Sequence, residues 1–154
     1  MKIILTIGTS GSGKSHWIKT LPKEEYVIIS PDEIRKELTG DISNKTKDKE
    51  VYDEVYKRTI KFLKQNRNII IDSTNLKKNQ RRKFITNVQL KAKVEFEYKL
   101  FELNPKEAKR RIKADIDAGI DRANVPDETI DRHAILYKQM LEDIKQEPLT
   151  KFKQ

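Results

Sequence analysis

Three short and almost entirely apolar runs stand out in the first half of the chain, and each is followed by a polar turn. They cover residues 3–7, 26–30 and 68–72. A brief apolar run between turn residues is typical of a strand whose two faces are both buried. The three runs therefore predict parallel strands in the interior of a sheet.

A fourth run, residues 93–103, alternates between apolar and charged positions instead. Its apolar positions are Val94, Phe96, Tyr98 and Leu100, and its charged positions are Glu95, Glu97 and Lys99. Such alternation indicates one wet face, and we expect this strand at the edge of the sheet. The residues after Pro148 fit either a short strand or a disordered tail.

Helical spacing fills the intervals between these runs. It predicts helices at about residues 14–20, 31–38, 48–66, 77–90, 104–118 and 127–146. Ser30 is a suitable N-cap for the second helix, with Pro31 in its first turn and Glu33 completing a capping box. Strands that alternate with helices predict an α/β protein with a mainly parallel sheet of four to five strands in three α/β/α layers.

The long helix at residues 48–66 has an apolar face at helical spacing. Tyr52, Tyr56 and Phe62 belong to this face together with four aliphatic residues, Val51, Val55, Ile60 and Leu63. We expect the three aromatic side chains in the core rather than on a base-stacking surface.

No internal repeat or Pro/Gly-rich linker divides the 154 residues. We therefore expect one domain at residues 1–147, with a helical lid around residues 105–126 and a C-terminal tail at residues 148–154. The sequence contains no apolar run of membrane-spanning length and no signal peptide. We therefore expect a cytoplasmic protein without a membrane partner. If a phage encodes it, the cytoplasm would be that of the host cell. Without cysteine the chain has no disulfides, thiolate metal sites or cysteine nucleophile.

The formal charge of +9 raises the question of a polyanionic partner. Lysine, isoleucine and asparagine are abundant together, however, and this bias can reflect genomic base composition. Charge alone leaves nucleic-acid binding undecided.

Residues 8–15, GTSGSGKS, match the phosphate-loop motif G-x-x-x-x-G-K-[ST]. Glycines let the backbone N–H groups turn around an anion, and the helix that begins near Lys14 directs its positive end to the same point. Lys14 would contact the β and γ phosphates of ATP or another NTP, and the Ser15 hydroxyl would bind Mg²⁺. The predicted nucleotide contacts are Gly8, Thr9, Ser10, Gly11, Ser12, Gly13, Lys14 and Ser15.

Polar residues follow the second and third predicted strands on the side of this loop. In parallel sheets the ligand lies at the carboxyl ends of the strands. Asp32 and Arg35, one helical turn apart, suit a carboxylate that takes the proton of an acceptor hydroxyl and an arginine that holds an acceptor phosphate. The alternative is a surface ion pair at a helix N-terminus. Asp72, at the end of an hhhhD pattern, would face Mg²⁺.

A basic segment, residues 109–113, and Arg122 flank the break at Gly119, as in a lid that brings cations to a transferring phosphoryl group. The two histidines, His16 and His133, lack the spacing of metal ligands, so we expect them to be structural. Trp17, beside the loop, is expected to pack.

Four blocks in this order, KIILTIGTSGSGKSHW, SPDEIR, IIIDSTNLKKNQRR and R-x-x-V-P at Arg122 to Pro126, resemble the kinase half of phage polynucleotide 5′-kinases, within the phosphate-loop kinase family. The resemblance extends to about Met140. It implies a general base at Asp32, a contact from Arg35 to the phosphate 3′ of the acceptor nucleoside, and an acceptor site bordered by Ser73, Thr74 and Asn75. It also implies a lid arginine at Arg122, which we count with Asp32 and Lys14 as catalytic.

Two features differ from the family pattern. Ser73 stands where the family has an aspartate directly before the Thr-Asn pair, and the spacing from Arg122 to Val125-Pro126 is different. Relatives often carry a phosphatase domain after the kinase. Here the chain ends, so we expect any 3′-end processing to be absent or to belong to another protein.

The sequence thus favours an ATP- and Mg²⁺-dependent kinase acting on the 5′-hydroxyl of DNA or RNA, with a separate phosphatase or ligase in the same pathway. Two other interpretations stay open, namely a kinase for a small-molecule hydroxyl (a nucleoside, sugar or antibiotic) and a nucleotide-binding switch without transfer activity. The oligomeric state, including a homo-oligomer, is also open.

Overall fold

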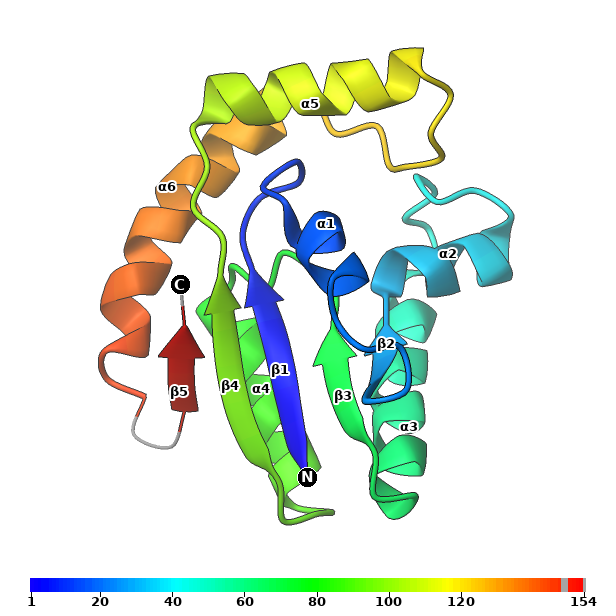
Figure 1. Cartoon of the computed structure of the whole chain (residues 1–154), viewed down its shortest axis with the longest axis vertical. Coiled ribbons are helices and arrows are strands. Elements are labelled where there is room, and N and C mark those ends of the chain that lie inside the picture. Colours follow the sequence, from blue (N-terminus) through cyan, green and yellow to red (C-terminus); the bar gives the residue numbers. More distant parts are fainter. Residues whose placement is uncertain (148–149, 154) are drawn as a thin grey trace.

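Five parallel strands form a single sheet in the order β2-β3-β1-β4-β5 (Figure 1). The structure of the chain is a computed structural model that describes residues 1–147 and 150–153. The strands are β1 (Lys2–Ile7), β2 (Tyr26–Ile29), β3 (Asn68–Ile71), β4 (Glu95–Leu100) and β5 (Thr150–Lys153). Since all the ladders are parallel, every strand ends at the same edge of the sheet.

The helices cover both faces of the sheet, so the predicted three-layer α/β fold is confirmed. Helix α1 lies in front of the sheet in Figure 1, and α3 and α4 lie behind it. The helices are α1 (Lys14–Lys19), α2 (Pro31–Thr39), α3 (Asp48–Lys64), α4 (Lys78–Gln89), α5 (Pro105–Asp117) and α6 (Asp127–Ile144). The core lies between the buried side chains of β1, β3 and β4 and the apolar faces of α3, α4 and α6.

Helix α2 begins as its sequence predicts. Ser30 is the N-cap, and its hydroxyl accepts a hydrogen bond of 3.3 Å from the backbone N–H of Glu33. Pro31 occupies the first turn, where a missing N–H costs nothing. Gly40, at φ 76°, ends the helix in a left-handed conformation. The cap therefore fixes the point at which Asp32 leaves the carboxyl end of β2.

The prediction of an interior position for the strand at residues 26–30 was wrong. β2 lies at one edge of the sheet, and Ile28 is 42% exposed. An apolar run shows that both faces of a strand are apolar, but not how many strands pair with it.

The prediction that the alternating strand lies at a sheet edge was also wrong. β4 lies between β1 and β5, and Glu97 on its charged face is 8% exposed and 3.8 Å from the Lys2 ammonium. The alternation shows which residues share a face, but it carries no information about a strand that joins from a distant part of the chain. That strand, β5, lies in the predicted tail; Pro148 itself is outside the described residues.

The aromatic residues of α3 do not all enter the core. Tyr56 and Phe62 pack against it as expected, whereas Tyr52 is 46% exposed. For Tyr52 the prediction of a core position was wrong: of the apolar residues in the first two turns of α3, Val51 and Val55 are in the core and Tyr52 lies outside it.

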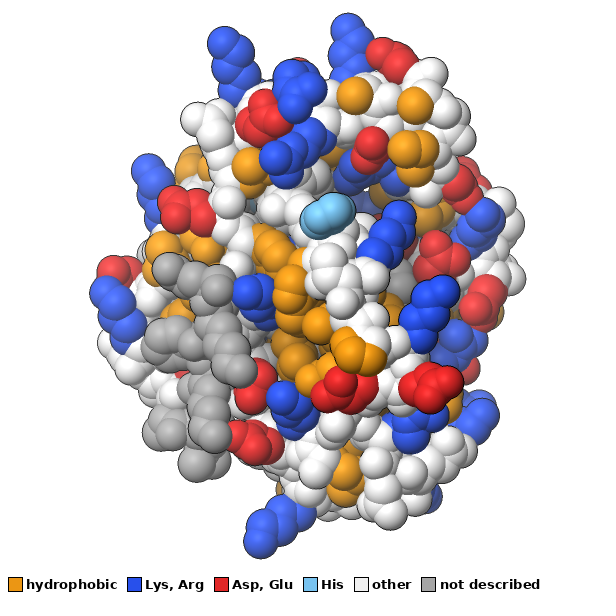
Figure 2. All heavy atoms as spheres, viewed as in Figure 1, with side chains coloured by type: hydrophobic (Ala, Val, Ile, Leu, Met, Phe, Trp, Pro, Cys, Tyr) orange, Lys and Arg blue, Asp and Glu red, His pale blue; other side chains and the backbone are white. Residues whose placement is uncertain are grey.

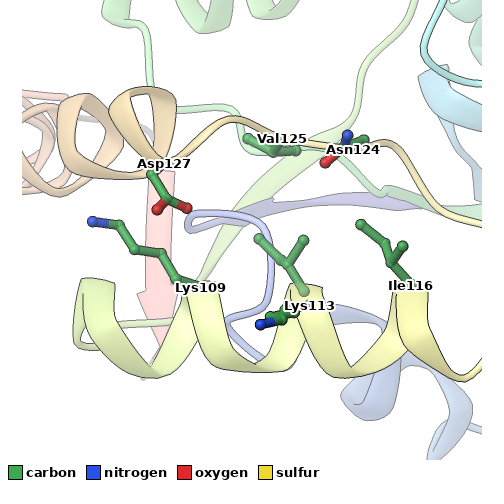
Figure 3. A pocket seen from close by; sticks show the side chains of 7 residues that line it. Lys109, Lys113, Ile116, Asn124, Val125 and Asp127 are labelled. Carbon is green, nitrogen blue, oxygen red and sulfur yellow. The ribbon is translucent and has the colours of Figure 1, made fainter.

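Helix α5 crosses above the carboxyl ends of the strands, and α6 descends beside the sheet (Figure 1). The two helices share a small apolar cluster, separate from the main core, of Ala108, Ile112 and Ile130 with Leu103 and Val125 packed against it. A cavity of about 210 Å³ lies between α5 and residues 124–127. Figure 3 shows the side chains that line it, with Lys109 and Asp127 at one end. The region predicted as a lid thus has its own packing.

Basic side chains are spread among acidic ones over the face of the molecule in Figure 2, and several stand above the rest at the end formed by α5. This distribution forms no continuous basic stripe on the visible face. Within the residues that the structure describes, no helix is long and apolar enough to cross a membrane.

Candidate active site

The phosphate loop connects β1 to α1 and passes close to the end of β4. A Cβ on Gly8 would lie 2.6 Å from the carbonyl oxygen of Phe101, so only glycine fits there. Gly13, the N-cap of α1, has φ 99°, which residues with a side chain rarely adopt. The glycines predicted from the motif therefore allow both the close approach and the turn into the helix.

The side chain of Lys14 folds back into the loop. Its Nζ donates hydrogen bonds to the carbonyl oxygens of Gly8 (2.8 Å) and Thr9 (2.7 Å), and the side chain is buried. Burial lowers the pKa of Lys14 to about 8; the carboxylate of Asp72 opposes this shift and Arg122 adds to it. The charges that act on Lys14 therefore come from Asp72, just beyond β3, and from Arg122, in the region predicted as a lid.

Asp72 and Ser15 are the predicted Mg²⁺ ligands. Asp72 is half-buried just beyond β3, and burial raises its pKa while the charge of Lys14 lowers it. Ser15 is exposed in the first turn of α1. Among the described residues, no group of three or more acidic, histidine or cysteine side chains forms a metal site. The donor set fits Mg²⁺ that takes one or two protein oxygens and completes its shell with phosphate and water.

Asp32 and Arg35 form a close ion pair. Nη1 of Arg35 lies 2.5 Å from Oδ1 of Asp32, and the Arg35 side chain is only 5% exposed while that of Asp32 is 53% exposed. A second carboxylate also binds the arginine, because Nε of Arg35 donates to Oδ1 of Asp48 at 2.9 Å. Asp48 therefore fixes the buried side of the pair, and the Asp32 carboxylate faces solvent.

Asp48 has no counterpart in the sequence prediction. It opens α3, thirteen positions after Arg35. Nothing in the local pattern separates it from an ordinary acidic residue in the first turn of a helix, and only the packing of α3 against α2 brings the two side chains together.

The turn after β3 connects the strands to the phosphate loop. Nδ2 of Asn75 donates to the carbonyl oxygen of Thr6 at 2.7 Å, and the Thr74 carbonyl oxygen accepts the N–H of Gly8 at 3.1 Å. The Ser73 carbonyl oxygen accepts the Thr6 hydroxyl at 2.9 Å. The structure thus gives this turn a supporting role, and substrate contact by Ser73, Thr74 and Asn75 stays a prediction.

Two lid arginines lie near the loop. Arg122 pairs with Asp115 at 2.6 Å, and its buried Nε has no hydrogen-bond partner among the described residues. Nη1 of Arg111 donates to the carbonyl oxygen of Gly11 at 3.3 Å. Glu107 pairs with Arg110 and Arg111, and the hydrogen bond from Arg110 lowers the pKa of this carboxyl to about 2. Of these arginines, Arg111 therefore contacts the phosphate loop directly, and each is paired with a carboxylate; their role in a lid stays a prediction.

His133 also contacts the loop, which sequence analysis did not anticipate. Its Nδ1 lies 3.1 Å from Oγ1 of Thr9, joining α6 to the phosphate loop. Burial lowers the pKa of His133 to about 4, and the positive charges of Arg132 and Lys14 act in the same direction. A half-buried position on a helix far along the chain gives no sequence pattern by which this contact could be found.

Aromatic side chains line a cavity of about 340 Å³ beside the loop. Its walls are Ser12, Trp17, Lys99, Leu100, Phe101, Glu102 and Tyr137. The rings of Trp17 and Phe101 meet edge to face at 5.6 Å between centroids, so Trp17 packs as predicted.

A phosphate loop at the end of β1, carboxylates at the neighbouring strand ends and a basic lid define a P-loop kinase fold. The chain belongs to the AAA domain family (AAA_33), whose profile matches residues 3–139. By fold and family it is a P-loop kinase domain, which confirms the family resemblance inferred from the sequence. A search of curated proteins finds no match.

Solved structures with the same fold include proteins of different functions. A chain of the Pnkp1/Rnl/Hen1 RNA repair complex is 23% identical with a TM-score of 0.78, covering 92% of this chain and 45% of that one. A second Pnkp1/Rnl/Hen1 structure is 27% identical with a TM-score of 0.59, covering 71% and 38%. Deoxyadenosine kinase from M. mycoides, with dCMP and dCDP bound, is 18% identical with a TM-score of 0.55, covering 99% and 90%. The chain thus spans less than half of the first two proteins.

Proposed function

We propose that this domain transfers the γ-phosphoryl group of ATP, or of another NTP, to the 5′-hydroxyl of DNA or RNA. The observation that carries the proposal is the Asp32–Arg35 pair, in which an exposed carboxylate is fixed by a buried guanidinium beside the phosphate loop. A nucleotide-binding switch has no use for such an acceptor base. The similarity to a chain of an RNA repair complex supports nucleic-acid ends as acceptors.

In the proposed reaction Asp32 accepts the proton of the acceptor hydroxyl as its oxygen bonds to the γ phosphorus and the bond to the β-phosphate oxygen breaks. Lys14 and the loop N–H groups hold the donor phosphates, and Arg122 stabilises the charge on the transferring group. Mg²⁺, which Ser15 and Asp72 would hold, supplies charge neutralisation for the donor phosphates. Arg35 holds the phosphate 3′ to the acceptor nucleoside.

We further propose residues 1–147 as the kinase domain, with the lid around residues 105–126 and the tail at residues 148–154 contributing β5. The proposed partners are nucleic-acid 5′-hydroxyl ends and a separate phosphatase or ligase in the same pathway, in the cytoplasm. A homo-oligomer is compatible with this assignment.

A small-molecule kinase is the second candidate, and one observation favours it. Arg35 is already paired with two carboxylates, so a phosphate on the acceptor is not required to neutralise it. The deoxyadenosine kinase neighbour supports the same alternative.

Transfer of labelled γ-phosphate to three acceptors separates these candidates: a 5′-hydroxyl oligonucleotide, a nucleoside 3′-monophosphate and a free nucleoside. The proposal expects label on the first two, its loss in Asp32→Asn and its weakening in Arg35→Ala. Asp53→Asn, an exposed carboxylate paired with Lys49 on α3, is the matched control. Label on the free nucleoside alone assigns a small-molecule kinase, and label on none of the acceptors leaves a non-transferring nucleotide-binding protein.

A further inference from the structure

Tyr52 is exposed at a place where the apolar spacing of α3 predicts a core residue. It is 46% exposed, whereas Tyr56, one turn later, packs against the core and its hydroxyl donates to the carbonyl oxygen of Asn87 at 3.3 Å. A large aromatic side chain that is turned out of the core leaves its ring accessible to a ligand.

The surroundings of Tyr52 belong to the acceptor side of the candidate site. Asp48 precedes it by four residues, so both side chains lie on the same face of α3. Asp48 holds Arg35, and Arg35 holds Asp32. Burial raises the pKa of the Tyr52 hydroxyl, an interaction with the Ser73 side chain just beyond β3 lowers it, and the charges of Arg35, Asp48 and Asp32 also act on it. Tyr52 therefore stands beside the proposed general base.

Arg35 keeps donor groups for a ligand despite its two carboxylate partners. Nε of Arg35 donates to Asp48, and Nη1 donates to Asp32 and also lies 3.5 Å from the carbonyl oxygen of Ile42. Nη2 has no hydrogen bond to a described residue, and it is not among the buried polar atoms that lack a partner. Its N–H groups therefore point to a place that solvent or a phosphate oxygen can reach.

We propose that Tyr52 is the stacking surface for the nucleobase of the acceptor nucleotide. This inference rests on the proposed function and deepens it, because it names a base contact for the acceptor. The hydroxyl of one nucleotide meets Asp32, its 3′ phosphate meets Nη2 of Arg35, and its base lies on the ring of Tyr52. Stacking on one ring is tolerant of sequence, since every base has a π-face, so this contact selects nucleotides without selecting a particular base.

The test is equilibrium binding of two ligands that differ only in the base. Isothermal titration calorimetry with a non-hydrolysable ATP analogue present compares a nucleoside 3′-monophosphate with the corresponding abasic sugar 3-phosphate. The variants are Tyr52→Ala, Tyr52→Phe and, as a matched control, Tyr26→Ala, a half-buried tyrosine at the opposite end of the sheet. The readout is the ratio of the two dissociation constants, which a general loss of folded protein leaves unchanged.

In the wild-type protein and in Tyr52→Phe, the ligand with the base should bind at least about fivefold more tightly, the lower end of what one base–aromatic stack contributes. The ratio should fall to about one in Tyr52→Ala and stay high in Tyr26→Ala. A wild-type ratio near one, or an unchanged ratio in Tyr52→Ala, overturns the inference.

The binding test and the transfer test fail separately. Base-dependent binding without transfer of label would retain the Tyr52 contact and remove the proposed kinase activity. Transfer of label to a 5′-hydroxyl oligonucleotide, together with a ratio of dissociation constants near one, would retain the kinase activity and remove the Tyr52 contact. Absence of binding by both ligands would overturn both.

Discussion

A buried ion pair ties the turn behind the candidate site to the end of α6. The Arg81 side chain, 0% exposed, lies 3.4 Å through Nη2 from Oε1 of Glu147, which is itself 3% exposed. Its Nη1 donates to the carbonyl oxygens of Asn75 (3.0 Å) and Leu76 (2.8 Å). The Tyr98 hydroxyl donates to the same carboxylate; burial raises the pKa of Tyr98, and the hydrogen bond to Glu147 raises it further.

Replacing Arg81 with methionine keeps most of the side-chain volume and removes the charge. The change leaves a buried carboxylate without its cation, which costs about 3–5 kcal/mol, and it also removes the donor to two carbonyl groups. Against a typical total stability of about 5–15 kcal/mol this loss is large. For a domain of this size we expect Tm to fall by about 6–20 °C.

Urea unfolding followed by circular dichroism measures the loss, with the double variant Arg81→Met/Glu147→Gln as the decisive comparison. Since the second change removes the stranded charge, the double variant should recover part of the stability lost in Arg81→Met. A loss below about 1 kcal/mol in Arg81→Met, or a double variant as unstable as the sum of the two single changes, would refute the assignment of Arg81 and Glu147 as a coupled buried pair.

Three further predictions concern the site itself. The pKa of Lys14 is about 8 in the free loop, and bound phosphates should raise it. ATP binding at pH 9 should therefore be accompanied by uptake of a proton. Calorimetry in two buffers of different ionisation enthalpy measures this uptake, which should be absent in Lys14→Arg. The pKa of His133 is about 4 when folded and about 6.5 when unfolded, so the unfolded chain binds more protons between these values. Stability is then complete above about pH 6.5 and falls toward pH 4, by about 1–2 kcal/mol at pH 5, and urea unfolding should show a smaller loss in His133→Gln. Asp48→Ala removes a hydrogen-bond acceptor of Arg35 and should raise KM for the 5′-hydroxyl oligonucleotide about tenfold. Asp48→Asn can still accept a hydrogen bond from Nε of Arg35 and should keep KM close to the wild-type value. Equal KM values in Asp48→Ala and wild type would contradict this role.

Sequence predicted the features that short-range chemistry determines. The phosphate loop, the cap of α2 at Ser30 and the two interior strands β1 and β3 follow from residues within a few positions of one another. Contacts that depend on distant packing escaped prediction. Asp48 meets Arg35 only because α3 folds against α2, and His133 meets Thr9 from a helix 124 positions later.

The predictions of an edge position for β4 and of a core position for Tyr52 were wrong for a related reason. In both cases the periodicity gave the face on which a side chain lies, but not what covers that face. β5 supplies the neighbour of β4, and the carboxyl end of the sheet leaves Tyr52 uncovered.

The charges around Arg35 favour an acceptor contact in addition to the one between Arg35 and the acceptor phosphate. On the proposed donor side, the buried ammonium of Lys14 interacts with the charge of Arg122, and Arg111 donates to the Gly11 carbonyl oxygen of the loop. On the acceptor side Arg35 lies between Asp32 and Asp48, so this cluster carries a net charge of one minus two, or −1. On the proposed function, an anionic acceptor should be attracted less strongly to Arg35 than the donor is to the loop, which would disfavour a triphosphate in the acceptor position. The proposed acceptor would then gain affinity from uncharged contacts, and the exposed ring of Tyr52 offers a large uncharged surface near Asp32, the proposed general base.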